Sequence, residues 1–175
     1  MRLKLYVVHG SHPCAAVEKA LAMKGLDYSV FEWPPPLHAP MQRLIFRRRT
    51  VPGLRIDGEK VQGSRAILRR LDELVPDPPL YPRDAEQRAR VEEAERWGDD
   101  IFQPVARELI WPALVSHPEA MISYSTRSKL PMPAPAVRLS APLIARMASR
   151  LNNTDARVAQ RVLVALPAQL DKIDA

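Results

Sequence analysis

The chain has 175 residues, a net charge of +6 and an apolar share of 46%. This length suffices for one domain of about 100 residues plus a second, smaller one, and the apolar share argues against a disordered chain. No apolar run approaches the roughly 18 residues that cross a bilayer, and the first residues lack the long apolar core of a signal peptide. We therefore expect a cytoplasmic protein without a membrane partner.

Cysteine occurs once, at Cys14, so no internal disulfide can form. The most basic segment holds Arg43 and the three arginines at 47–49, a feature also found in nucleic-acid-binding proteins. No recognition motif accompanies these arginines, and a solvated surface accounts for them, so we expect no nucleic-acid partner. His9 and His12 alone are too few ligands to predict a metal site.

Strand and helix patterns alternate in the first half of the chain. Residues 3–8 are a short apolar run typical of a buried strand. Residues 13–24 predict a helix, with Ser11 as a plausible cap, Pro13 in the first turn and Gly25 as the stop. One stripe of this helix is expected to face the domain interior and holds Cys14, Val17, Leu21 and Lys24.

The rest of this half predicts a further helix and the strands of a hairpin. A strand at 28–33 is closed by the prolines at 34–36, and residues 37–45 form a looser helix. Asp57-Gly58 is a two-residue turn signal. It joins strands at 51–56 and 60–62, and a last helix starts at Ser64. The order β-α-β-α-β-β-α predicts an α/β domain with a helix-flanked sheet.

A proline-rich segment, residues 76–82, is expected to be a stiff linker and separates domain 1–82 from domain 83–175. The second domain is predicted to be all-α. Residues 85–111 form a long amphipathic helix that Pro104 should kink, and further helices are expected at 139–151 and 155–166.

Three local motifs carry chemistry. Ser11-His12-Pro13-Cys14 opens a helix, and the free N–H groups and partial positive charge of a helix N-terminus favour a thiolate. Thr50-Val51-Pro52 contains an X-Pro bond that can be cis and would expose the main chain before it. Residues 62–67 open a second helix, whose N-terminus can hold a carboxylate.

The order and spacing of these motifs resemble the N-terminal domain of cytosolic glutathione transferases, over residues 3–110. The resemblance implies a thioredoxin-like domain in which Ser11 stabilises the glutathione thiolate, and Cys14 in the same turn is a second catalytic candidate. Val51 would pair through its main chain with the cysteinyl part of glutathione, and Pro52 would be the cis-proline. Ser64 would hold the γ-glutamyl carboxylate, and Arg65 could add a charged contact.

Two features depart from the family pattern. The family usually has Glu or Gln directly before the serine, where this chain has Gly63; Gln62 is the nearest substitute. The helical half also resembles only part of the family's second domain, so we expect a partial C-terminal domain and exposed apolar faces that favour association.

The resemblance implies a glutathione transferase-like enzyme that conjugates a thiol to a small electrophile, with glutathione as cosubstrate, no metal, and a homodimer as the assembly. Two alternatives stay open. The scaffold could use another low-molecular-weight thiol, which Gly63 makes reasonable, or it could be a non-catalytic binding module.

Overall fold

The computed structural model describes residues 1–34, 37–125, 128 and 133–174. The chain divides into two compact units, Met1–Val91 and Glu92–Ala175. The prolines at 35 and 36, expected to close the second strand, lie outside the described residues. The domain boundary after residue 82 stays a prediction, because the two compact units meet nine residues further along the chain.

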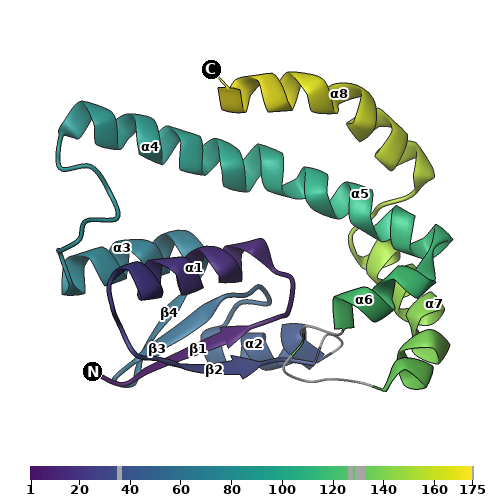
Figure 1. Ribbon diagram of the computed structural model, residues 1–175, viewed down its shortest axis with the longest axis horizontal. Helices are drawn as coiled ribbons and strands as arrows, with labels where there is room; N and C mark the ends of the chain where they lie inside the picture. Colours follow the sequence, from purple (N-terminus) through teal and green to yellow (C-terminus); the bar gives the residue numbers. More distant parts are fainter. Residues whose placement is uncertain (35–36, 126–127, 129–132, 175) are drawn as a thin grey trace. The chain divides into compact units, whose positions relative to one another are not determined.

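The first unit is built around a four-stranded mixed sheet of order β2-β1-β3-β4 (Figure 1). Strand β1 pairs with β2 in parallel and with β3 antiparallel, and β3 pairs with β4 antiparallel. The elements follow the predicted β-α-β-α-β-β-α order: β1 Leu3–Val7, α1 His12–Met23, β2 Ser29–Glu32, α2 His38–Phe46, β3 Gly53–Ile56, β4 Glu59–Gln62 and α3 Ser64–Leu74. The predicted thioredoxin-like α/β fold class is thus confirmed.

Helices α1 and α3 lie on one side of the sheet and α2 lies on the other (Figure 1). The predicted interior stripe of α1 is confirmed, since Cys14, Val17, Leu21 and Lys24 are all buried. Most of them join residues from β1, β3 and α3 in the main hydrophobic core.

The α2 side of the sheet has a smaller aromatic core of Tyr6, Trp33 and Phe46. A Cβ built on Gly53 would lie 2.6 Å from the Phe46 ring, so glycine is the residue that lets this ring reach the sheet. The buried amide of Gln42 on the same helix has no hydrogen-bond partner among the described residues.

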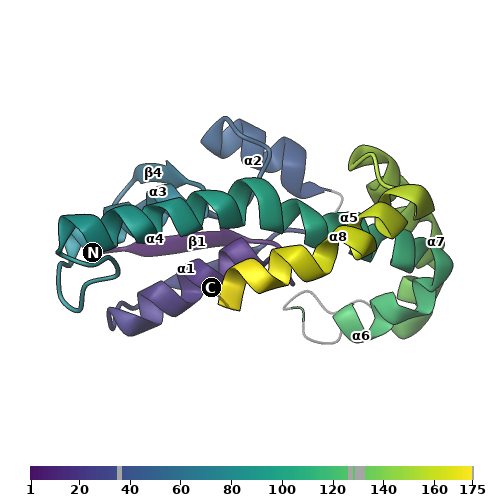
Figure 2. The same cartoon turned by 90° about the horizontal axis from the view of Figure 1, so that it is seen from above.

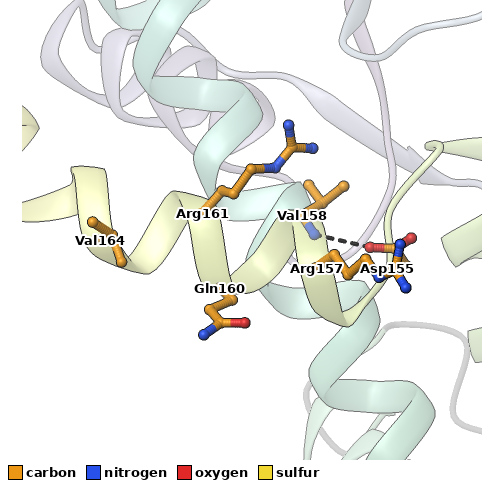
Figure 3. A pocket seen from close by; sticks show the side chains of 6 residues that line it. All are labelled: Asp155, Arg157, Val158, Gln160, Arg161 and Val164. Carbon is orange, nitrogen blue, oxygen red and sulfur yellow. Dashed lines mark hydrogen bonds between the residues drawn. The ribbon is translucent and has the colours of Figure 1, made fainter.

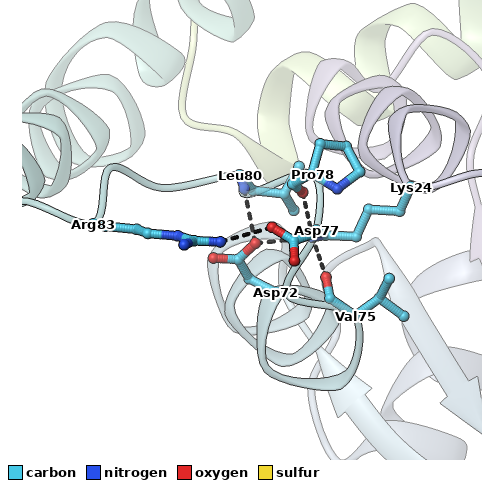
Figure 4. Close-up of polar contacts among 7 residues, drawn as sticks. All are labelled: Lys24, Asp72, Val75, Asp77, Pro78, Leu80 and Arg83. Carbon is cyan, nitrogen blue, oxygen red and sulfur yellow. Dashed lines mark hydrogen bonds and ion pairs between the residues drawn. The ribbon is translucent and has the colours of Figure 1, made fainter.

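A buried lysine ties the end of α3 and the following segment to α1 (Figure 4). The side chain of Lys24 is fully buried, and its ammonium donates to Asp72 Oδ1 at 2.9 Å and to the carbonyls of Val75 and Pro78. The same carboxylate oxygen accepts the N–H of Leu80 at 2.7 Å. Partial burial raises the pKa of Asp72, but these hydrogen bonds outweigh it, so the pKa lies below its ordinary value of 3.8.

The helix that continues from the first unit is interrupted. Helix α4, Ala85–Trp97, passes into a π-helical turn, Gly98–Phe102, and then into α5, Gln103–Ser116. Pro104 follows this π turn by two residues, and the predicted kink at Pro104 stays a prediction. The extra residue of a π turn aligns positions five apart, and Trp97 stacks on Phe102 with ring centroids 5.2 Å apart.

The second unit is helical, as predicted, and within it α5 packs against α7 and α8 (Figure 2). After a 3₁₀ turn, Pro118–Ala120, the remaining helices are α6 Met121–Ser125, α7 Ala134–Leu151 and α8 Ala156–Asp174. A small-residue ridge on α7 at Ala141, Ala145 and Ser149 is buried. In the described part of the chain no helix is long and apolar enough to span a bilayer.

Candidate functional site

The register of the sheet brings all three predicted motifs to one end of it. Tyr6, at the end of β1, lies opposite Gly53, the first residue of β3. Gly53 in turn lies opposite Gln62, the last residue of β4. The start of α1, the Val51-Pro52 segment and the start of α3 therefore all adjoin this end of the sheet.

Ser11 occupies the N-cap position of α1 with extended backbone, as predicted. Its carbonyl accepts the N–H groups of Cys14 and Ala15, but its hydroxyl makes no capping hydrogen bond. A serine at this position normally uses its oxygen to bind an N–H of the first turn. The half-buried Ser11 hydroxyl instead interacts with the Cys14 thiol. Of the first-turn N–H groups, only that of His12 has no acceptor among the described residues, because Pro13 carries no N–H and Cys14 donates to the Ser11 carbonyl. This helix end still favours negative charge.

Cys14 is packed in the main core and is only 3% exposed. Burial raises the pKa of its thiol, while hydrogen bonding to the Ser11 side chain and to the Val8 main chain lowers it by less. A buried thiol with a raised pKa is a poor nucleophile. These observations favour a packing role for Cys14, and its catalytic role stays an untested prediction.

The Val51-Pro52 peptide bond is cis, which confirms the prediction for Pro52. Pro52 is fully buried, and its carbonyl accepts the N–H of Gly63 at 2.9 Å. The main chain of half-buried Val51 forms no hydrogen bond to another described residue. Its N–H and C=O are therefore available for pairing with an extended ligand backbone.

The start of α3 supplies the third part of the site. Gly63 is the N-cap, with φ +91°, and a Cβ at this position would meet nothing within 4 Å. Ser64 is the first helical residue, and its half-buried hydroxyl has no hydrogen-bond partner among the described residues. Arg65 follows, half-buried, in the first turn of the helix. This end of α3 therefore presents a hydroxyl, first-turn N–H groups and open space over Gly63.

The side chain of Gln62 bonds within the protein, and its predicted role as a ligand contact stays a prediction. Its Nε2 donates to the carbonyl of Thr50 at 2.8 Å and to the Thr50 Oγ1 at 2.7 Å. These bonds tie the end of β4 to the segment that leads into Val51-Pro52. The sequence did not reveal Thr50 as a partner, because the pairing depends on the antiparallel register of β3 and β4.

The second unit contains a shallow hollow lined by α8 and by the residue directly before it (Figure 3). Its lining residues are Asp155, Arg157, Val158, Gln160, Arg161 and Val164. The Asp155 carboxylate accepts the N–H of Val158 at 2.8 Å and so caps the helix. These residues lie along one helix and its cap, so their proximity follows from the helix itself and does not indicate a ligand site.

Comparisons with known proteins agree with the fold of the first unit. The family model described as glutathione S-transferase, N-terminal domain, matches residues 5–79. Glutathione S-transferase Z1 of Arabidopsis thaliana is 43% identical over 94 residues, which cover 50% of this chain and 41% of that protein. The match therefore spans less than half the length of this curated relative.

Solved structures share the fold at low sequence identity. The β-etherase LigF from Sphingobium matches with a TM-score of 0.68 and 22% identity, over 98% of this chain and 72% of that chain. A glutathione S-transferase from Rhodospirillum rubrum matches with a TM-score of 0.55 and 22% identity, over 93% of this chain and 87% of that chain. The chain therefore carries, over residues 5–79, the thioredoxin-like N-terminal domain of the glutathione S-transferase family.

Proposed function

We propose that the first unit binds a small thiol, with glutathione as the first candidate, and activates it for attack on an electrophile. The observation that carries this proposal is the Ser11 hydroxyl. It lies at the N-terminus of α1, makes no capping bond, and adjoins the same end of the sheet as the unpaired main chain of Val51.

The chemistry follows from charge stabilisation. A free thiol has a pKa of about 8.5 and is mostly protonated at neutral pH. A hydrogen bond from Ser11 and the helix N-terminus would stabilise the thiolate and lower that pKa. The thiol proton passes to solvent, and the sulfur lone pair forms a bond to an electrophilic carbon as that carbon's leaving group departs or its π electrons shift.

The remaining parts of the ligand have partners at the same end of the sheet. The main chain of Val51 can pair with the cysteinyl amide groups, and Ser64 with the N-terminus of α3 can hold a carboxylate. A glutathione transferase homologue from Burkholderia of 21% identity and TM-score 0.51 has bound glutathione, which supports this choice of thiol. Gly63 supplies no side chain, so we expect weaker binding than a Glu or Gln there would give.

We also propose a homodimer in the cytoplasm, the assembly and compartment expected from the family resemblance. Support for self-association comes from α7, where Leu139, Leu143 and Leu151 lie four or eight residues apart and are exposed by more than half. Exposed apolar side chains that lie together on a surface favour association with another apolar surface.

The Ser64→Ala variant tests the ligand placement. A hydrogen bond from Ser64 to the ligand carboxylate would contribute to the binding free energy, and its loss should weaken glutathione binding about tenfold. Isothermal titration calorimetry on the full chain measures this, and Ser140→Ala on α7 is the matched control, since its hydroxyl bonds only within that helix. Equal affinities of Ser64→Ala and the unmodified chain would show that α3 does not hold the carboxylate.

A further inference from the structure

A row of like charges crosses the sheet of the first unit. Lys4 on β1 lies directly opposite Arg55 on β3, which lies directly opposite Lys60 on β4. Directly paired residues project from the same face of a sheet, and all three side chains are exposed. Like charges in such pairs reduce the stability of a sheet, so this row is unfavourable for folding by itself.

No carboxylate neutralises the row in the described part of the chain. None of the three cations forms an ion pair with a described residue. The neighbouring Glu59 instead pairs with Arg70 of α3, on the opposite face. The face is therefore left with an uncompensated positive charge.

The row lies on the side of the sheet that carries α2. The Lys4 ammonium is 5.5 Å from the centroid of the Tyr6 ring, and that ring packs edge-on against Phe46 of α2. The last turn of α2 and the segment after it add four exposed arginines that also have no ion-pair partner among the described residues: Arg43, Arg47, Arg48 and Arg49. Between Glu32 and Asp57 the chain has five arginines and no acidic residue.

The charge of the whole protein is concentrated in this unit. Met1–Val91 has sixteen lysines and arginines against ten aspartates and glutamates, which accounts for the full net charge of +6. The second unit is neutral by the same count, with ten of each. The positive charge of the chain is thus a property of the first unit.

Exposed apolar side chains accompany these cations. Helix α2 turns Gln42 and Phe46 inward, and the outward residues Leu37 and Leu44 are 54% and 76% exposed. Met41 lies between them at helical spacing, also exposed. Aliphatic side chains beside arginines are typical of helices that lie in the interface of an anionic membrane.

We propose that the α2 side of the first unit is a docking surface for anionic lipid, with the outward residues of α2 entering the headgroup region. The row on the sheet and the arginines in and after the last turn of α2 would meet the lipid phosphates and carboxylates. The expectation of no membrane partner rested on the absence of a long apolar run, which a protein lying on a bilayer surface does not need.

Arg55→Glu separates binding from folding. It replaces two like-charge pairs by two opposite-charge pairs, so it should raise the melting temperature while weakening binding to phosphatidylserine-containing vesicles by about tenfold or more. Arg146→Glu on α7 changes the net charge equally and is the control.

The Leu44→Gln variant tests the apolar part of the surface. It should weaken vesicle binding and leave any binding to a single-stranded RNA homopolymer unchanged.

Co-sedimentation of the full chain with vesicles gives the readout. The proposal requires binding to vesicles that contain phosphatidylserine, little binding to pure phosphatidylcholine, and a loss of binding at high salt. Three results would overturn it: no vesicle binding by the folded chain, an equal loss in Arg146→Glu, or tight RNA binding that Arg55→Glu weakens while vesicles stay unbound.

Discussion

Replacing Ser11 by alanine is expected to raise the pKa of a bound thiol by about one to two units. The conjugation rate at neutral pH should fall roughly ten- to a hundredfold in kcat/KM, because a smaller fraction of the thiol is ionised. The reason is the hydroxyl at the start of α1, which makes no capping bond and can turn from the Cys14 thiol to donate to a ligand sulfur. The ultraviolet absorbance of the bound thiolate, measured against pH, gives the pKa directly.

The same variant should hardly change the stability of the protein. A serine that caps a helix through its side chain contributes about 1 kcal/mol to stability, but no such bond exists at Ser11. Ser11→Thr keeps a hydroxyl and should retain most of the activity. An unchanged thiol pKa in Ser11→Ala would remove Ser11 from the mechanism, and a large loss of stability would show that its role is structural.

Replacing Lys24 by methionine is expected to lower the free energy of unfolding by about 3 kcal/mol. Methionine keeps most of the buried aliphatic stem, but it leaves the Asp72 carboxylate and the carbonyls of Val75 and Pro78 without their donor. Urea denaturation measures the change. Lys19→Met, on an exposed position of the same helix, should be nearly neutral. A small effect of Lys24→Met would mean that water replaces the ammonium.

The hydrogen bonds between Lys24 and Asp72 also predict that the stability of the protein depends on pH. Because the pKa of Asp72 is lowered in the folded chain, its contribution to stability is present above its ordinary pKa of 3.8 and is lost as the pH falls through the lower, folded value. The Asp72→Asn variant should lack this part of the acid sensitivity. Denaturation midpoints recorded between neutral and acid pH compare the two proteins.

Local features of the first unit could be predicted from the sequence because short-range rules set them. Helical spacing placed Cys14 and Val17 on the buried side of α1, and the Asp57-Gly58 signal placed the turn of the hairpin. Gly25, predicted as the stop of α1, lies two residues after its last residue and has the positive φ that glycine adopts at low cost.

The features that the sequence did not reveal depend on distant pairings. The spacing in α1 predicted that Lys24 faces inward, but its partners lie about fifty residues further along the chain. The π-helical turn after Trp97 has no simple sequence signal, and only Pro104, two residues beyond it, indicated an irregularity in this helix. Likewise, the row through Lys4, Arg55 and Lys60 exists only in the observed register.

A calorimetric titration of reduced glutathione into the full, size-checked chain tests the central claim most directly. The account predicts saturable binding of micromolar to low-millimolar affinity, weakened in both Ser11→Ala and Ser64→Ala. The absence of binding to a folded sample would contradict it. Glutathione would then not be the ligand of the site formed by Ser11, Val51 and Ser64, and Gly63 would be the first residue to examine.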